Sequence, residues 1–145
     1  MEPFFTKVQV RWSDLDPNVH LRHSVYYDWG ALCRIEFLHL HGLTASLMQQ
    51  LHFGPILFRE ECVFRKEIHL GDDVRVGLKL LKSRRDYSRW TMQHDIVKNG
   101  DTISAILTVD GAWIDTGLRK LAVPPAKVAE VFSHLPMDAA FQWLD

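Results

Sequence analysis

Polar residues with catalytic potential gather in one short segment near the N-terminus. Asp14, Asp16, His20 and His23 all lie between two more apolar stretches. A carboxylate can serve as a nucleophile or a general base, and an imidazole can transfer protons near neutral pH. The Asp-Pro-Asn run that begins at Asp16 cannot continue a strand, because proline lacks the amide N–H and Asp and Asn favour turns. The sequence therefore predicts a turn that could support hydrolysis.

A long amphipathic helix should follow this turn. Its predicted range, 25–41, carries apolar side chains at helical spacing: Val25, Trp29, Leu32, Cys33, Phe37 and Leu40. Ser24 is the predicted N-cap, and Gly42 stands where many helices end in a left-handed residue. A helix of this range would be ~25 Å long. Its first turn would direct free N–H groups and the positive end of the helix dipole at the acidic turn.

The rest of the chain predicts an antiparallel sheet. Alternating apolar residues indicate strands over 4–12, 56–70, 74–80, 90–96 and 103–115. Asn99-Gly100 is typical of a type I′ hairpin turn. Short helices are expected over 44–51 and 126–132, with one or two further helical turns after Pro136. Helices and strands that are segregated along the chain indicate an α+β fold.

Glu60 is out of place in this pattern, because it falls at an apolar position of the strand predicted over 56–70. A β-bulge near Arg59 would turn the side chain outward. Alternatively, the carboxylate lines a pocket on the inner face. The residues alone leave both interpretations open.

Composition predicts one globular domain, residues 1–145, in the cytoplasm. The 145 residues are 47% hydrophobic and 24% charged, with a formal net charge of -1, so no overall basic field favours nucleic acid or an anionic membrane. No signal peptide or membrane-spanning run is predicted. Cys33 and Cys62 lie in apolar patterns, and we expect two free thiols in a reducing compartment.

The segment from Val10 to Phe37 resembles the opening motif of the hotdog-fold acyl-CoA thioesterases of the 4-hydroxybenzoyl-CoA thioesterase family. In that motif a strand ends in an aromatic residue, Asp-x-Asp and a small turn follow, and a helix carries an early Tyr and a later Arg. The matching residues are Trp12, Asp14, Asp16, Pro17, Asn18, His23, Tyr26 and Arg34. The stretch 80–97 also resembles the family's hairpin, so the resemblance extends over roughly 8–114.

The resemblance implies a role for each matching residue. Asp16 is the expected catalytic carboxylate, and the backbone N–H at His23 would polarise the thioester carbonyl, with the His23 side chain as a possible addition. Asp14 is expected to be structural. Substrate binding is expected from four residues: Ser24, Tyr26, Arg84 and Arg85. The two arginines match basic residues that meet the CoA phosphates in the family.

The resemblance also implies the architecture. A five-stranded antiparallel sheet would wrap around the long central helix, with a short C-terminal extension from about residue 134. One helix cannot cover both faces of such a sheet, so we expect a homodimer. In the family, dimers often pair into tetramers and the active sites lie at the subunit interface.

The predicted activity is hydrolysis of an acyl-CoA to a free acid and CoA. Asp16 could attack the thioester or act as a general base on water. We expect no metal and no cofactor, and no Gly-x-Ser-x-Gly elbow of a serine hydrolase is present. A carrier-protein thioester remains an alternative substrate. Two other functions stay open: a hotdog enoyl-CoA hydratase or dehydratase, which the run DLDPNVH partly matches, and a non-catalytic acyl-CoA-binding module.

Overall fold

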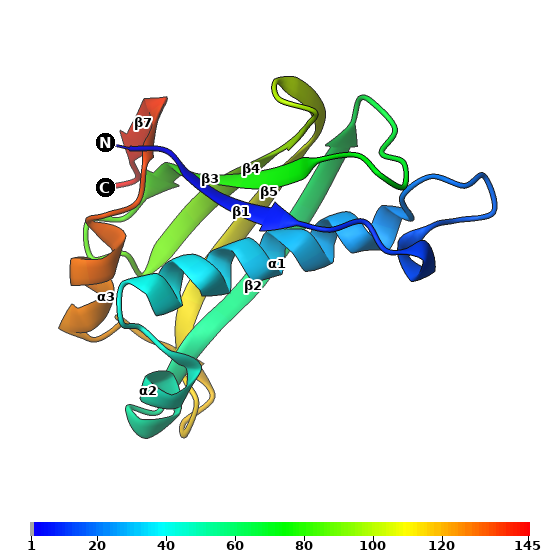
Figure 1. Cartoon of the computed structure of the whole chain (residues 1–145). Coiled ribbons are helices and arrows are strands. Elements are labelled where there is room, and N and C mark those ends of the chain that lie inside the picture. Colours follow the sequence, from blue (N-terminus) through cyan, green and yellow to red (C-terminus); the bar gives the residue numbers. More distant parts are fainter. Residues whose placement is uncertain (1) are drawn as a thin grey trace.

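The computed structural model describes residues 2–145 and has one curled sheet with a helix lying across it (Figure 1). The sheet has seven strands: β1 Phe4–Val8, β2 Phe53–Phe64, β3 Val74–Ser83, β4 Arg89–Lys98, β5 Thr102–Asp115, β6 Lys120–Leu121 and β7 Met137–Trp143. The helices are a 3-10 turn at Trp12–Asp14, α1 at His23–Leu40, α2 at Ala45–Gln50 and α3 at Ala126–Phe132. This confirms the predicted α+β class.

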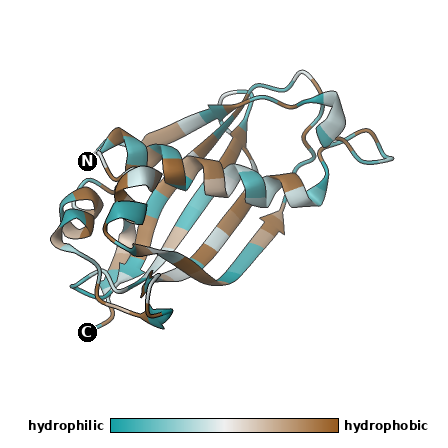
Figure 2. Cartoon of the chain, turned by 90° about the horizontal axis from the view of Figure 1, so that it is seen from below, coloured by the Kyte–Doolittle hydropathy of each residue, from teal (hydrophilic) through white to brown (hydrophobic). Residues whose placement is uncertain are grey.

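Five strands form the main path of the sheet, in the order β1-β3-β4-β5-β2, and all neighbours on this path are antiparallel. The short strand β6 adds to β5, and β7 pairs with β3 in parallel. The expected sheet of five strands is therefore correct for the main path but omits two short additions. Figure 2 shows α1 crossing the sheet, whose strands alternate between hydrophobic and hydrophilic residues.

The helix α1 buries one face against the sheet. Val25, Trp29, Cys33 and Phe37 recur every four residues, and each is 6% exposed or less. A Cβ at Gly30 would lie 2.3 Å from Leu107 Cδ2, so a side chain at this position would have to displace the buried Leu107. The prediction was wrong for two residues of the expected apolar face, since Leu32 and Leu40 are 39% and 68% exposed.

The predictions for the two ends of α1 had different outcomes. The helix begins at His23 with Arg22 as N-cap, so Ser24 is not the cap; the Ser24 hydroxyl accepts a hydrogen bond from Arg22 Nε at 2.9 Å instead. The predicted ending is confirmed, because Gly42 has φ +87°. The N–H groups of Gly42 and Leu43 donate to the carbonyls of His39 and Leu38 at 3.0 and 2.8 Å, the two bonds of a Schellman motif.

Two predicted strands are shorter in the structure. The first ends at Val8, and Trp12 lies in the 3-10 turn with 74% of its surface exposed. The strand β2 ends at Phe64, several residues before the predicted end. Its register with β5 shifts between Leu57 and Arg59, which confirms the bulge, and Glu60 is exposed.

The C-terminal tail was predicted as helical turns, and this was wrong because residues Met137–Trp143 form β7. The reason lies in β3. The strand β1 pairs with only the first half of β3, up to Leu78, and the backbone from Leu80 to Ser83 would otherwise be unpaired on that side. The tail supplies the missing strand, beginning with a hydrogen bond of 2.8 Å from Leu80 N–H to the Pro136 carbonyl.

Other local predictions are confirmed. Asn99 and Gly100 both have positive φ, 52° and 100°, as a type I′ turn requires. The helix α3 has the predicted bounds and buries Val128, Val131 and Phe132 in the core. None of the helices within residues 2–145 combines the length and the apolar character needed to cross a membrane.

Candidate active site

Asp14 fixes the loop that leads into α1. Its carboxylate is 2% exposed and accepts hydrogen bonds from the Arg11 backbone N–H and side chain, the latter at 2.9 Å from Nη2 to Oδ1. The hydrogen bond from Arg11 lowers the pKa of Asp14, so this buried group stays ionised. The Asp14 carbonyl also accepts the N–H of Arg22, the N-cap of α1, at 2.7 Å. Asp14 is therefore structural, as expected.

Asp16 lies in the tight turn between these two anchors. Its Oδ1 accepts the Asn18 N–H at 2.9 Å, and its Oδ2 lies 3.3 Å from His20 Nδ1. Val19 has φ +65°, a strained conformation for a β-branched residue. The surrounding hydrogen bonds thus hold the turn in one shape, and that shape positions the Asp16 carboxylate.

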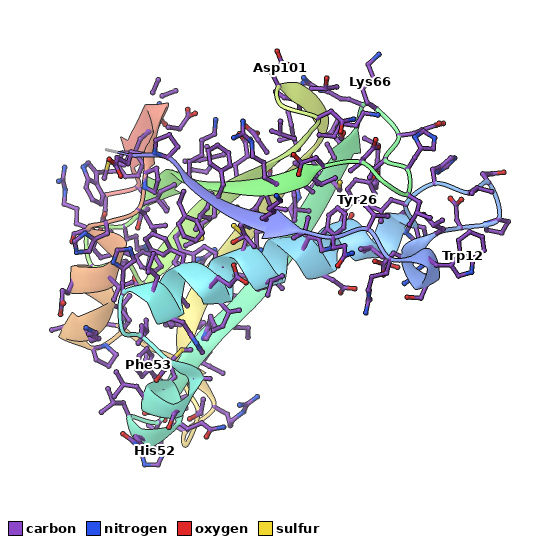
Figure 3. All side chains as sticks on the ribbon, viewed as in Figure 1. Trp12, Tyr26, His52, Phe53, Lys66 and Asp101 are labelled. Atoms are coloured by element: carbon purple, nitrogen blue, oxygen red, sulfur yellow. The ribbon has the colours of Figure 1, made fainter. Side chains whose placement is uncertain are left out.

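A pocket of about 270 Å³ joins this turn to the first turn of α1. It is lined by Asp16, His20, Leu21, His23, Tyr26, Phe64, Arg65, Lys66 and Glu67. The structure therefore brings together three of the predicted site residues, Asp16, His23 and Tyr26. Ser24 does not line the pocket. In Figure 3 Tyr26 on α1 and Lys66 after β2 lie at the same end of the molecule.

The first turn of α1 has unpaired backbone hydrogen-bond donors. No acceptor within residues 2–145 takes the backbone N–H of His23 or Ser24, while the next N–H, of Val25, donates to the Arg22 carbonyl at 3.0 Å. Free N–H groups at a helix N-terminus attract negative charge. The pocket is thus lined by the Asp16 carboxylate and by His23, whose free N–H could bind an oxyanion.

His20 links Asp16 to the segment after β2. Its Nδ1 faces Asp16, and its Nε2 lies 3.7 Å from Glu67 Oε1. Tyr26 forms the floor, with its ring edge-on to Phe64 at 4.9 Å between centroids. Burial, together with the nearby Cys62, Asp16 and Glu67, raises the pKa of Tyr26 to about 12. The phenol is therefore neutral at physiological pH and keeps its O–H donor.

Arg84 and Arg85 do not line this pocket. They lie in the turn between β3 and β4, near α3 and the C-terminus, whereas the Asp16 turn is at the other end of α1 (Figure 1). The Arg85 N–H donates to Asp145 at 3.1 Å, and its guanidinium stacks 4.9 Å from the Trp143 ring centroid. Within one chain they lie away from the Asp16 pocket, and their contact with CoA phosphates stays a prediction.

Sequence reasoning missed the segment Arg65, Lys66 and Glu67 as a pocket wall, because their alternation with apolar residues predicted a continuing strand. In the structure the N–H groups of Arg65 and Lys66 both donate to the Ser104 carbonyl, at 2.8 and 3.0 Å, and the chain turns toward α1.

As for metals, the part of the chain from residue 2 to 145 holds no cluster of three His, Cys, Asp or Glu side chains that could bind an ion.

Residues 10–132 match the family model described as the Thioesterase-like superfamily. The match covers most of the chain and includes the whole Asp16 pocket. The chain belongs to this superfamily. Membership places it among the thioester hydrolases, and the resemblance found in the sequence to the hotdog thioesterases is confirmed. No curated protein matches the sequence.

Several solved structures share the fold. A hypothetical protein from Staphylococcus aureus, solved in complex with CoA, has a TM-score of 0.85 at 21% identity and covers 92% of this chain and 83% of its own. A Thermus thermophilus thioesterase complexed with coenzyme A and Zn has 27% identity, a TM-score of 0.72 and coverages of 89% and 91%. A 1,4-dihydroxy-2-naphthoyl-CoA thioesterase from Synechocystis has 18% identity, a TM-score of 0.81 and coverages of 92% and 98%.

The anchoring function of Asp14 can be tested by pH-dependent unfolding. Asp14→Asn should lower the free energy of unfolding by roughly 1–3 kcal/mol at neutral pH, because it removes charge-assisted hydrogen bonds to a buried group. The folded-state pKa of Asp14 is lowered, so this stabilisation is present above the unfolded pKa of ~3.9 and is lost as the pH falls through the folded pKa. Urea unfolding of both proteins at neutral and acid pH measures the difference.

The difference in the free energy of unfolding between the wild type and Asp14→Asn should therefore become smaller at acid pH. Asp101→Asn, in the exposed β4–β5 turn, is the matched control and should change stability little at either pH. A difference of equal size at both pH values would show that the charge of Asp14 contributes nothing to the free energy of unfolding.

Proposed function

We propose that the protein hydrolyses acyl-CoA thioesters to a free acid and CoA in the Asp16 pocket. One observation carries the proposal: Asp16 and His23, whose backbone N–H is unpaired at the start of α1, line a single pocket. The superfamily supports the reaction class. The CoA found with the Staphylococcus aureus and Thermus thermophilus proteins supports CoA as the leaving group.

The reaction needs two contributions from the pocket. The backbone N–H of His23 would donate to the thioester oxygen as it gains negative charge, an effect whose loss typically costs about 10²–10³ in rate. Asp16 would either attack the carbonyl carbon, releasing CoA thiolate and leaving a mixed anhydride for water to cleave, or take a proton from an attacking water. General-base catalysis alone contributes about 10²–10⁴.

His20 would hold the charge of Asp16 in place. With Nδ1 on Asp16 and Nε2 toward Glu67, the imidazole bridges two carboxylates and orients the one that reacts. Asp14 is unsuited to the hydratase alternative, because its carboxylate is buried against Arg11 rather than paired with His20. The superfamily supports hydrolysis over hydration.

We further propose a homodimer that joins two β2 strands edge to edge, in the hotdog arrangement with α1 as the central helix. The strand β2 is at the end of the sheet, and its outer edge has no partner within the described chain. It exposes four apolar side chains: Leu57 at 37%, Phe58 at 49%, Val63 at 47% and Phe64 at 51%. A long apolar edge of this kind favours association with another strand.

Such a dimer would bring the paired arginines to the Asp16 pocket. Arg89, which follows the β3–β4 turn, and Ile56 both lie opposite Ala112 of β5, so that turn sits at the Ile56 end of β2. The Asp16 pocket lies at the Phe64 end. A two-fold axis near the middle of β2 reverses the partner strand, so Arg84 of the partner subunit would approach this subunit's pocket.

Within this proposal a pairing of dimers into a tetramer, a carrier-protein thioester as substrate and a cytoplasmic location remain predictions.

Asp16→Asn should lower kcat for acyl-CoA hydrolysis by at least ~10²-fold, because the amide can neither attack nor accept a proton. Release of free thiol from a panel of acyl-CoAs measures this rate, and circular dichroism checks the fold. Asp101→Asn is the matched control and should retain full activity. A kcat near that of the wild type would end the assignment of Asp16.

Arg84→Ala should raise KM for acyl-CoA esters and leave N-acetylcysteamine esters unaffected, since the latter lack the phosphates. Lys7→Ala removes another exposed cation, on β1 beside the beginning of β3, and should change neither KM. Equal losses on both types of ester would refute a phosphate contact.

Sedimentation velocity tests the dimer. We expect the wild type to sediment with about twice the 16.8 kDa chain mass. Val63→Asp adds a charge to the β2 edge and should shift the population to monomers, whereas Phe5→Asp, at a residue of similar exposure on β1, should not. If Val63→Asp leaves the mass unchanged, the interface lies elsewhere.

A further inference from the structure

Glu67 lies between two histidines at the wall of the Asp16 pocket. Its Oε1 is 3.7 Å from His20 Nε2, and its Oε2 is 3.6 Å from His69 Nε2. The two imidazole rings meet edge-on, with their centroids 6.2 Å apart. On the far side of His20, Nδ1 lies 3.3 Å from Asp16, and on the far side of His69, Nδ1 lies 4.0 Å from Asp72. Carboxylates and imidazoles therefore alternate from the pocket to the turn before β3.

The backbone that carries Glu67 is fixed on both sides of the residue. The Glu67 carbonyl accepts a hydrogen bond from Lys98 Nζ of β4, and the next carbonyl, of Ile68, accepts the Leu21 N–H at 2.7 Å. Leu21 directly follows His20 in the chain, so the second bond also sets the place of the imidazole relative to Glu67. The Glu67 side chain is 64% exposed, yet it extends from a backbone that the rest of the fold holds in position.

Both ring nitrogens of His20 face a carboxylate, and only the imidazolium carries an N–H on each of them. A neutral ring would leave either Asp16 or Glu67 without an N–H to face. Within residues 2–145 no lysine or arginine side chain comes within 4 Å of the Glu67 carboxylate, so its charge acts on the two histidines. The other titratable or charged groups around His20 belong to the pocket wall or to the edge-on ring: His23, Tyr26, Arg65, Lys66 and His69. The cations in this group disfavour an imidazolium, and Glu67 offsets them.

We propose that Glu67 is a positioning residue for thioester hydrolysis: its negative charge keeps His20 protonated on both nitrogens and so holds the imidazole against Asp16. An imidazolium paired at both ends has a fixed ring plane, whereas a ring paired at one end can turn and release the Asp16 carboxylate. His69 faces the second oxygen of Glu67 and so orients the first oxygen toward His20. This role rests on the proposed function, because it affects the rate only if Asp16 reacts.

The pH dependence of kcat tests this role, measured by thiol release from octanoyl-CoA or benzoyl-CoA, whichever is hydrolysed faster. Activity should need an ionised Asp16 and a protonated His20, so kcat should fall toward both acid and alkaline pH. Glu67→Gln removes a negative charge beside the imidazolium and should move the alkaline fall to lower pH by about half a pH unit. At mildly alkaline pH its kcat should decrease about 2–5-fold, the effect of losing an exposed ion pair, and KM should change less than kcat.

Two further variants separate charge from shape. Glu67→Asp keeps the charge on a shorter side chain, so its alkaline fall should lie closer to that of the wild type than the fall of Glu67→Gln does. Glu130→Gln is the matched control on α3, because its side chain is 65% exposed and also pairs with one neighbour, Lys127. It should change neither kcat nor the pH profile. A wild-type profile in Glu67→Gln, or equal shifts in Glu67→Gln and Glu67→Asp, would overturn the proposal.

The same measurements distinguish this role from the assignment of Asp16. If Asp16→Asn is inactive and Glu67→Gln shifts the alkaline fall, both are supported. If Asp16→Asn is inactive and Glu67→Gln behaves as the wild type does, the role of Glu67 is refuted and hydrolysis by Asp16 stands. If Asp16→Asn retains a kcat near that of the wild type, the assignment of Asp16 is refuted, and the role of Glu67 is refuted with it.

Discussion

The buried carboxylate of Asp14 is the contact on which the candidate site depends. It ties the chain before the Asp16 turn, through Arg11, to the chain after it, since its own backbone carbonyl binds the N-cap of α1. The hydrogen bond from the Leu21 N–H to the Ile68 carbonyl, at 2.7 Å, then ties the end of the turn to the segment after β2. The distance from Asp16 to the first N–H groups of α1 is therefore fixed by contacts outside the pocket itself. A loop held in this way can keep a strained residue such as Val19.

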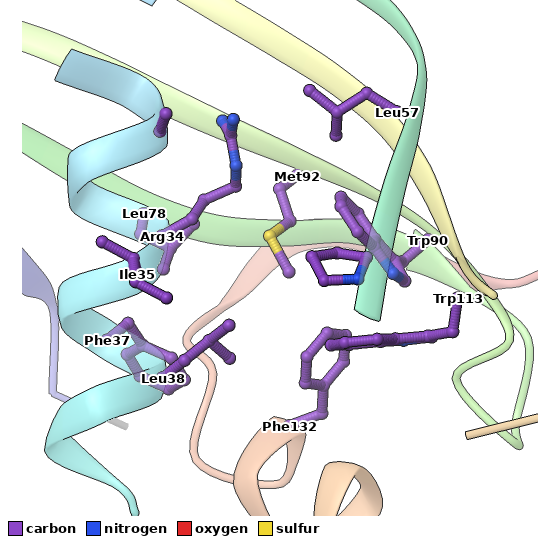
Figure 4. A pocket seen from close by; sticks show the side chains of 12 residues that line it. Arg34, Ile35, Phe37, Leu38, Leu57, Leu78, Trp90, Met92, Trp113 and Phe132 are labelled. Atoms are coloured by element: carbon purple, nitrogen blue, oxygen red, sulfur yellow. The ribbon is translucent and has the colours of Figure 1, made fainter. Parts of the chain in front are cut away.

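Gly30 lies between two halves of α1 that line different pockets. Its close approach to Leu107 lies between the Asp16 pocket and a cavity of about 220 Å³ that Arg34 and Trp113 line between α1 and the sheet (Figure 4). The N-terminal half supplies unpaired N–H groups and Tyr26, and the C-terminal half supplies Arg34 and the apolar wall. One helix thus lines a polar pocket near its start and an apolar cavity nearer its end.

The sequence could predict those features of the fold and the site that depend on local pattern. The period of α1, its end at Gly42, the Asn99-Gly100 turn and the grouping of Asp16 with His23 all follow from neighbours in the chain. The tail could not be predicted, since β7 forms only because β1 leaves half of β3 unpaired. The cavity between α1 and the sheet could not be predicted for the same kind of reason. Its lining residues Arg34, Trp90, Trp113 and Phe132 are far apart in sequence and meet only in the fold. The pocket wall at Arg65 to Glu67 depends on the backbone of Ser104, which no pattern reveals.

The two cysteines have a practical consequence. Burial raises the pKa of both Cys33 and Cys62 to about 11, so almost none of either is thiolate at neutral pH. Disulfide reagents such as an aryl disulfide chromophore attack thiolates, and the folded protein should add almost no background colour when such a reagent reports released coenzyme. A rise to two reactive thiols per chain would instead show that the protein has unfolded. The same assay therefore carries an internal control for the folded state.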